Sequence, residues 1–484
     1  MGHKKYLVLL FLLAWVPAWS QVRLEHASSP QGHEALVVEN RLARYTFWSD
    51  GGVLASVYLY FAPYGTKATE VVPGWDKKEL LPGVSLPLEI ELLGEGEGVS
   101  PDLYGIKAER KGAGEVEVRL SWQGKGLTVE KRFFIAGKAV YLVPVEVRLS
   151  GEAKGLRIIL GHIPTGSKAP RIVSLCDGKP VDGFPSEEAR GRIEGIGLVD
   201  AGTVYFWKFP QGLPRGTRLF HGVNRAGQPV FGLLVPELSG ELILETAFYG
   251  GRNRYVLLEK AGLSSLIKLN VFGRFMVGVI HFLQFLYRAT GNYGWAIIIF
   301  TIVAQILLFP LTRKQIHSMA KLQRLQPKIQ KLQEMYKDDR ETLQKQLIEL
   351  YRTEKVNPLG GCLPFLLQFP FLILLWRAIF NSAELFHLAP SFLWIPDLSL
   401  PDPYYIIIAL TVGVQLLGQW LSMRRIPEQK GQGIGWVMPI LFGFLFRSFP
   451  AGLWLYYFIY SIIQSTLQAI VYWELSHKGP AKAG

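Results

Sequence analysis

The chain has 484 residues, with 52 Lys and Arg against 39 Asp and Glu, which gives a net charge of +13. Hydrophobic residues make up 49% and charged residues 19% of the chain, which excludes a disordered or collagen-like protein. Residues 22–262 carry a net charge of only +1, whereas residues 263–484 carry +10 together with long apolar segments. The composition therefore predicts a membrane protein with one large soluble domain.

The N-terminal residues 1–21 begin with Lys4 and Lys5 and continue with about 14 apolar residues. Ala18-Trp19-Ser20 is an acceptable cleavage site, so this segment is either a cleaved signal peptide or an uncleaved anchor helix. We favour the anchor, because flanking tryptophans help a short helix to span a bilayer. Both interpretations export the residues that follow.

Residues 22–262 show short alternating stretches, such as 115–120 and 141–147, that are typical of half-buried strands. Gly-rich segments at 50–52 and 94–98 predict turns between them. Many strands and turns in one region favour an antiparallel all-β sandwich. His162 and His221 are isolated in the sequence, so we expect them to be structural.

Residues 263–290 predict a helix with one apolar face and one basic face. Arg274, His281 and Arg288 recur every seven residues, opposite an apolar series that begins at Phe272. A helix lying in the membrane interface and a membrane span are the two alternatives. We favour the interfacial helix, because a span would place Arg274 and His281 near or within hydrocarbon.

Five apolar segments follow in residues 291–476, at about 293–311, 359–381, 404–421, 434–447 and 451–473. The fourth is short and contains Pro439, which should break it. The loop 313–356 carries 11 Lys and Arg, whereas the loop 382–403 carries none. The positive-inside rule places 313–356, 422–433 and the short tail 477–484 in the cytoplasm, and the β-domain outside.

The loop 313–356 predicts a cytoplasmic hairpin of two amphipathic helices. An apolar stripe that includes Met319 and Leu325 repeats at helical spacing in its first half. Pro327 should kink or restart that helix, and Asp338-Asp339 suits the start of the second one. A solvated connector is the alternative. We favour an exposed stripe that contacts a partner or lipid.

Catalysis is not expected. Asp397, Asp402 and His387 fall in an outer loop, and Cys362 has no histidine near it in sequence. No phosphate-binding loop, metal-ligand spacing or paired-cysteine motif is present in the sequence. We therefore predict no enzymatic activity, no metal and no cofactor.

The apolar segments contain polar residues that share helix faces. One face carries Thr301 and Gln305, another carries Tyr457, Ser461 and Gln464, and Arg377 lies in the second segment. Polar side chains avoid lipid, so these faces should line a wet cavity. For Gln415 and Gln419, which share a face of the third segment, we favour a helix–helix contact.

Several motifs in 290–473 resemble the YidC/Oxa-type membrane protein insertases. They include Asn292-Tyr293-Gly294-Trp295, Phe309-Pro310-Leu311-Thr312, Leu325-Gln326-Pro327-Lys328, Asn357-Pro358-Leu359-Gly360-Gly361-Cys362 and Phe449-Pro450-Ala451-Gly452. The exported domain after an anchor resembles the Gram-negative-type members, whose periplasmic domain is a β-supersandwich. The resemblance implies a polytopic α-helical membrane protein with a five-helix core.

The resemblance also implies a function. The family inserts nascent membrane proteins through a hydrophilic groove that is open to the cytoplasm and to lipid, alone or with the Sec translocon. Thr301, Gln305 and Tyr457 fall where the family lines this groove, although Gln305 replaces the usual arginine. We expect Arg377 to supply the missing charge, unless it points outward to headgroups or to Glu384.

The same resemblance implies nascent proteins, the Sec translocon, lipids and the ribosome as partners, in a bacterial inner membrane. The short tail predicts weak ribosome binding, carried mainly by Arg313, Lys314, Arg424 and Arg425. The rival interpretation is a small-solute transporter or channel with an external β-domain, which would normally show internal repeats. A β-domain that binds sugar on a membrane anchor is a further alternative, and the five apolar segments argue against it.

Overall fold

The computed structural model describes residues 22–63, 66–72, 85–93, 102–112, 114–137, 141–164, 169–185, 191–354, 363–425 and 434–477. The predicted anchor 1–21, the turn 94–98 and the tail after His477 lie outside the described residues. The chain divides into two compact units between Lys268 and Leu269, each described here by itself. The division falls within the segment 263–290 that we assigned to the amphipathic helix.

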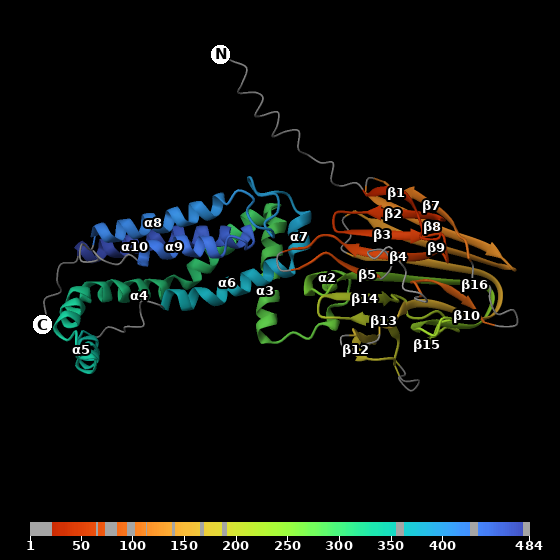
Figure 1. Cartoon of the computed structure of the whole chain (residues 1–484), viewed down its shortest axis with the longest axis horizontal. Coiled ribbons are helices and arrows are strands. Elements are labelled where there is room, and N and C mark those ends of the chain that lie inside the picture. The colour runs from red at the N-terminus through yellow and green to blue at the C-terminus, as the bar shows by residue number, and fades with distance from the viewer. Residues whose placement is uncertain are drawn as a thin grey trace, which may run out of the picture. The chain divides into compact units, whose positions relative to one another are not determined.

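The first unit consists of antiparallel strands (Figure 1). One sheet has the order β1-β2-β3-β4-β5, from β1 (Arg23–Ser28), β2 (Glu34–Glu39), β3 (Ala43–Trp48), β4 (Val53–Leu59) and β5 (Thr69–Val72). The second sheet has the order β12-β11-β13-β14-β16-β10-β9-β8-β7, with β15 on β16 and β6 on β10. Its strands are β6 (Ile90–Leu92), β7 (Gly105–Arg110), β8 (Glu115–Gly124), β9 (Leu127–Ala136), β10 (Leu142–His162), β11 (Arg171–Cys176), β12 (Lys179–Asp182), β13 (Ile193–Val199), β14 (Thr203–Lys208), β15 (Arg218–Val223) and β16 (Pro229–Arg252).

Two long strands, β10 and β16, form the centre of the second sheet. The sequence predicts only short strands here, yet these two pair along almost their whole length. Gly151 and Gly240 face each other near the middle of the pair, both with positive φ, of 134° and 102°. This is backbone that glycine adopts readily. The glycines therefore let each strand continue where an alternating pattern would be expected to stop.

The two sheets contact each other through apolar side chains. Phe47 of β3 packs against Phe133 of β9, with ring centroids 4.8 Å apart. Strand β9 alternates buried and more exposed residues along its length, as the period of a half-buried strand requires. The predicted turn at Asp50-Gly51-Gly52 connects β3 and β4, and both glycines have positive φ. The unit ends with α2 (Tyr255–Lys260) and the short 3-10 helix η2 (Ser264–Leu266).

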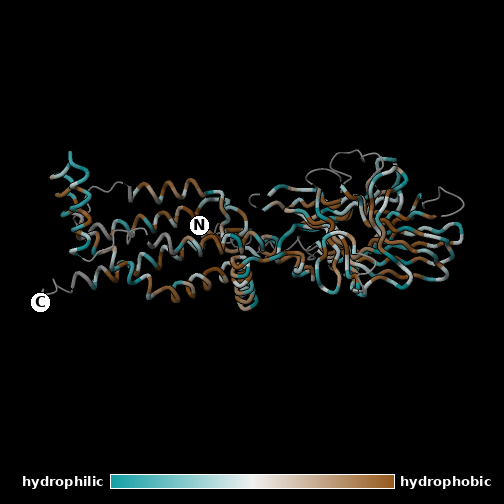
Figure 2. The backbone as a smooth tube through the Cα atoms, turned by 90° about the horizontal axis from the view of Figure 1, so that it is seen from below, coloured by the Kyte–Doolittle hydropathy of each residue, from teal (hydrophilic) through white to brown (hydrophobic). Residues whose placement is uncertain are grey.

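The second unit is helical. Its helices are α3 (Val271–Thr290), α4 (Tyr293–Met335), α5 (Arg340–Thr353), α6 (Leu363–Asn381), α7 (Ala383–Leu388), α8 (Ile406–Arg425), α9 (Ile434–Leu445) and α10 (Ala451–His477). Figure 2 shows that most of their length is apolar, whereas α5 and the adjoining end of α4 are more hydrophilic. Helix α10 packs against α4, α6 and α8, and α9 packs against α8.

Helix α3 runs across the direction of α4, α6, α8 and α10 (Figure 1). Its start is capped by Asn270, whose side chain accepts a hydrogen bond from the Gly273 backbone N–H at 2.7 Å. Met276, Ile280 and Leu283 are buried against its neighbours, and Arg274, His281 and Arg288 are exposed. The helix is thus amphipathic as predicted, and its crosswise direction suits an interfacial position.

Helix α4 is continuous for 43 residues, through both Pro310 and Pro327. Of the two outcomes predicted for Pro327, the structure excludes a restarted helix and leaves a kink. The expected break at Pro439 is wrong, since Pro439 lies inside α9. A helix tolerates an internal proline when packing on neighbouring turns compensates for the lost backbone hydrogen bond. Asp339 does cap α5 as expected, since its carboxylate accepts the Thr342 backbone N–H at 3.0 Å.

One helix among the described residues, Tyr293–Leu322, is both long enough and apolar enough to cross a membrane. Two shorter apolar helices cover Ile406–Leu421 and Trp436–Leu445. Helix α10 is long, but Ser461, Gln464, Ser465 and Gln468 interrupt its apolar character. The predicted count of five spans therefore remains a proposal.

Candidate functional site

A stripe of polar residues runs along one buried face of α4. Thr301, Gln305, Thr312 and Gln315 follow one another at spacings of four, seven and three residues, so they share that face. Each is at most 5% exposed. By helix rise the stripe extends for about 21 Å. We call these four residues the α4 polar stripe, and sequence reasoning found only its first two members.

Two amide nitrogens of the α4 polar stripe have no hydrogen-bond partner in the described part of the chain. Thr301 donates to the Ile297 carbonyl within its own helix, at 2.7 Å. The Nε2 atoms of Gln305 and Gln315 are buried, and no described residue hydrogen-bonds to either of them. A buried donor without a hydrogen-bond partner destabilises the fold by about 1–3 kcal/mol. We therefore expect water or another chain to hydrogen-bond with these two amides.

The polar face of α10 is used in two different ways. Ser461 accepts a hydrogen bond from Gln415 of α8 at 3.2 Å and donates to the Tyr457 carbonyl at 2.7 Å. The Ser461 hydroxyl therefore takes part in the α8–α10 contact. This agrees with the helix–helix contact that we favoured for Gln415. Gln464, one turn further along, has a buried Oε1 atom with no hydrogen-bond partner among the described residues.

A hydrogen bond that the sequence did not predict joins α6 and α10. Gln368 is buried and donates from Nε2 to the Tyr456 hydroxyl, at 2.6 Å. The Tyr456 ring also lies 6.4 Å from that of Phe300 on α4. Tyr456 thus contacts both α4 and α6 from its place on α10. Helical spacing could not have predicted this hydrogen bond. Its two residues lie on different helices, and each is a single polar group among apolar neighbours.

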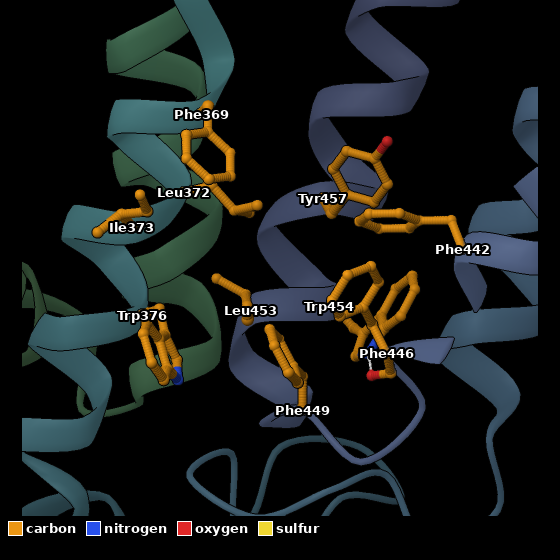
Figure 3. A pocket seen from close by; sticks show the side chains of 10 residues that line it. All are labelled: Phe369, Leu372, Ile373, Trp376, Phe442, Phe446, Phe449, Leu453, Trp454 and Tyr457. Atoms are coloured by element: carbon orange, nitrogen blue, oxygen red, sulfur yellow. Dashed lines mark hydrogen bonds between the residues drawn. The ribbon is translucent and has the colours of Figure 1, made fainter. Parts of the chain in front are cut away.

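Beside this contact lies an apolar cavity of about 400 Å³ between α6, α9 and the start of α10 (Figure 3). Phe369 and Tyr457 directly follow the two hydrogen-bonded residues in the sequence, and both point into the cavity (Figure 3). Its remaining lining is aromatic or aliphatic: Leu372, Ile373, Trp376, Phe442, Phe446, Phe449, Leu453 and Trp454. Tyr457, which we assigned to a polar groove, thus contributes its ring to an apolar wall.

Arg377 is exposed, which favours the outward-pointing one of the two alternatives that we left open. The buried face of α6 carries Leu375, Ala378 and Ile379. Arg377 follows Leu375 by two residues, or about 200° around the helix, so its side chain lies on the opposite, exposed face. There its guanidinium lies 5.7 Å from the centre of the Phe272 ring on α3.

The predicted recruitment residues fall in different surroundings. Arg313 and Lys314 are exposed on α4, and Met319 is half-buried. Leu325 is buried with Ile329 against the apolar seam of α5, formed by Leu347, Leu350 and Tyr351. The expectation of an exposed stripe is therefore wrong at Leu325, because the two hairpin helices bury it between themselves. The side chains of Arg424 and Arg425 lie outside the described residues.

The outer-loop residues that we weighed for catalysis do come together. His387 Nδ1 lies 2.8 Å from Asp397 Oδ2, and Asp397 Oδ1 accepts from the Ser399 hydroxyl at 2.7 Å. The carboxylate therefore stands between the imidazole and the hydroxyl, whereas a nucleophile needs the imidazole beside it. Asp402 accepts the Ile407 backbone N–H at 2.8 Å and so supports the start of α8. No metal-binding cluster occurs within the described ranges.

The helical unit thus contains both a buried polar stripe on α4 and an apolar cavity between α6, α9 and α10. Residues 285–478 match the family model described as 60Kd inner membrane protein. The chain is 39% identical over 237 residues to the membrane protein insertase YidC of Geobacter sulfurreducens, covering 47% of this chain and 44% of that protein. It is 42% identical over 206 residues to the YidC of Aeromonas salmonicida, covering 42% and 37%.

Two solved structures are similar to the whole chain. An active YidC insertase with its first transmembrane domain resolved gives a TM-score of 0.60 at 21% identity, covering 98% of this chain and 99% of that one. YidC from Thermotoga maritima gives 0.51 at 17% identity, covering 92% and 99%. These two show a shared fold. The resemblance to the YidC/Oxa-type insertases is confirmed, although the matched sequence spans less than half of the curated relatives.

Proposed function

We propose that this protein is a membrane protein insertase, which transfers a polar segment of a nascent protein across the bilayer while the adjoining apolar helix enters lipid. The observation that carries the proposal is the pair of unpartnered buried amides on α4, at Gln305 and Gln315. In hydrocarbon every backbone polar group without a partner costs several kcal/mol. Amides held inside a helical unit offer a passing segment temporary hydrogen bonds and so lower that barrier.

The apolar cavity supplies the second requirement. A substrate helix needs an apolar surface to contact as it leaves a polar interior, and Phe369, Trp376 and Phe442 offer one. The Gln368–Tyr456 hydrogen bond joins residues next to the cavity-lining Phe369 and Tyr457, and the Tyr456 ring lies 6.4 Å from that of Phe300 on α4. We infer that a substrate keeps its polar segment along the α4 polar stripe while its apolar helix passes the cavity between α6 and α9.

The remaining features of the proposal follow the resemblance. The core comprises five membrane helices, preceded by an anchor in residues 1–21, with the β-unit in the periplasm and the C-terminus in the cytoplasm of a bacterial inner membrane. The Sec translocon and the translating ribosome are its proposed partners. We propose no enzymatic activity, which agrees with the separation of imidazole and hydroxyl by Asp397. The comparisons lend no support to a small-solute transporter.

Complementation tests the proposal. A bacterium depleted of its own insertase should regain growth and the insertion of a reporter membrane protein when it expresses this chain. The double variant Gln305→Leu with Gln315→Leu should accumulate normally, because replacing unsatisfied buried amides by apolar groups does not destabilise a fold. It should nevertheless fail to support growth.

Gln330→Leu with Gln344→Leu is the matched control, because both glutamines are exposed on the hairpin. This control should support growth fully. Growth of the cells that carry the Gln305 and Gln315 double variant would show that the stripe does not carry insertion. Failure of the unmodified chain in several hosts would contradict the insertase function itself.

A further inference from the structure

We propose that the exposed face of α4 just beyond its apolar segment binds the headgroup of an anionic phospholipid. We call the residues Lys314, His317, Ser318 and Lys321 the α4 basic face. They line a hollow of about 610 Å³ together with Phe309, Pro310 and Arg313. The residues at spacings of three and four lie along one side of the helix, opposite the buried Gln315, Ile316 and Ala320.

The charges on this face are largely uncompensated. Arg313, at the edge, pairs with Glu474 of α10 at 3.0 Å. Among the described residues no carboxylate lies within ion-pair distance of Lys314, His317 or Lys321. Two lysines, a neighbouring hydroxyl and an imidazole that donates a proton provide the donors that a phosphodiester oxygen accepts.

The position along the helix favours a lipid over a free anion. From Tyr293 to Leu311 the helix rises by about 27 Å, close to the thickness of the hydrocarbon core of a bilayer. Arg313 and Lys314 follow at once, where phospholipid headgroups lie if α4 crosses the membrane as proposed. Ile306 and Leu307, two turns earlier, are 68% and 74% exposed, as expected of a lipid-facing surface.

The apolar members of the hollow favour a lipid over RNA. Phe309 and Pro310 lie one turn before Lys314, on its hydrocarbon side. An acyl chain running past Phe309 and Pro310 brings its own phosphate to Lys314, with Lys321 further into the headgroup layer. A nucleic acid would leave this apolar part of the hollow unused.

Native mass spectrometry of the full-length protein in neutral detergent tests this site, with phosphatidylglycerol and phosphatidylcholine as the two probes. The unmodified protein should retain phosphatidylglycerol in preference to phosphatidylcholine. The double variant Lys314→Gln with Lys321→Gln should bind phosphatidylglycerol about thirtyfold more weakly, since each basic residue near a membrane surface contributes roughly a factor of five. Its retention of phosphatidylcholine should not change.

The matched control is Lys331→Gln with Lys337→Gln, which removes the same charge from exposed positions of the hairpin. It should bind phosphatidylglycerol like the unmodified protein. Equal weakening in both double variants, or equal binding of the two lipids, would overturn the proposal. So would unchanged lipid binding with lost ribosome co-sedimentation, which would assign the face to RNA. A failure of complementation by the unmodified chain would contradict the insertase function and leave the lipid result standing.

Discussion

The resemblance to the insertases implies an arginine at the position that Gln305 occupies. The glutamine is 4% exposed and keeps a buried amide donor without a partner among the described residues. Arg377 lies on the exposed face of α6 near Phe272, so we propose that it does not replace this charge. The interior therefore works, in our proposal, through neutral hydrogen-bonding groups.

We accordingly expect Arg377→Ala to insert substrates with acidic exported segments at the rate of the unmodified protein. The lost contact with Phe272 should cost at most about 1 kcal/mol, as for other exposed cation–π pairs. The measurement is protease protection of a reporter whose exported segment carries several aspartates, with a neutral version as control. A selective loss for the acidic reporter would show that Arg377 does supply charge to the substrate path.

Lys131 is the second residue whose role the sequence did not reveal. Its ammonium is fully buried between the sheets, donates to the carbonyls of Gly52 and Leu88 at 2.7 Å, and lies 4.2 Å from the Tyr104 ring centre. Burial lowers the pKa of Lys131 to about 7. The residue connects the β3–β4 turn to the second sheet.

The stability of the β-unit should therefore rise with pH above neutrality. Between pH 7 and 10.5 the unfolded chain keeps the Lys131 proton that the folded chain loses, so raising the pH favours the folded state in this window. Lys131→Met should remove that dependence, and Lys107→Met on the exposed side of β7 should keep it. Pulse proteolysis of the full-length protein in urea at pH 7 and pH 9 measures the effect. A pH dependence that survives in Lys131→Met would contradict the assignment.

At the scale of elements, the α8–α10 contact depends on a glycine. A Cβ atom at Gly418 would approach the Ser465 hydroxyl to 2.6 Å, closer than real contacts allow, whereas one at Gly413 in the same helix would meet nothing within 4 Å. Gly418→Val should therefore separate α8 from α10 and lower the melting temperature in detergent. Gly413→Val is the matched control and should leave it unchanged. Equal melting of the two variants would show that the contact adjusts without loss.

The hairpin is the other element with a separable role. Ile316 and Ala320 of α4 pack against Val471 of α10, whereas Leu325 and Ile329 form a cluster with other residues of the hairpin. Replacing residues 324–352 by a short Gly/Ser bridge should thus leave the helical unit folded but unable to insert substrates. Size-exclusion behaviour and reporter insertion together test this. A deletion that inserts normally would end the proposed role, and a longer deletion from residue 314 should unfold the unit.

For the whole molecule, charge predicts the orientation in the membrane. The loop 313–356 is strongly basic and the region 22–262 is nearly neutral, so these should lie on opposite sides. Single cysteines at Lys331 and at Glu152, both exposed, test this in a protein whose Cys176 and Cys362 are replaced by serine. A membrane-impermeant reagent should label only the Glu152 position from outside the inner membrane. Labelling of both positions from that side would contradict the topology.

The sequence by itself determined the division into a β-unit and a helical unit, the amphipathic helix α3, the cap of α5 and the resemblance to the insertases. These depend on composition, local periodicity and short motifs, which act within a few residues of each other. Thr301 and Gln305 were found in the same way, because residues four apart share a helix face. The same helical spacing could also have predicted Thr312 and Gln315, which continue this face.

Only the tertiary structure decided which polar groups have partners. Gln368 finds Tyr456 across 88 residues, Ser461 finds Gln415, and Lys131 finds carbonyls 43 to 80 residues away. Arg377 turned outward and Leu325 inward for the same reason, since the face that a helix buries depends on the neighbour packed against it. A periodic pattern predicts that a helix has a polar or an apolar face. Which residue packs against that face depends on the fold of the whole chain.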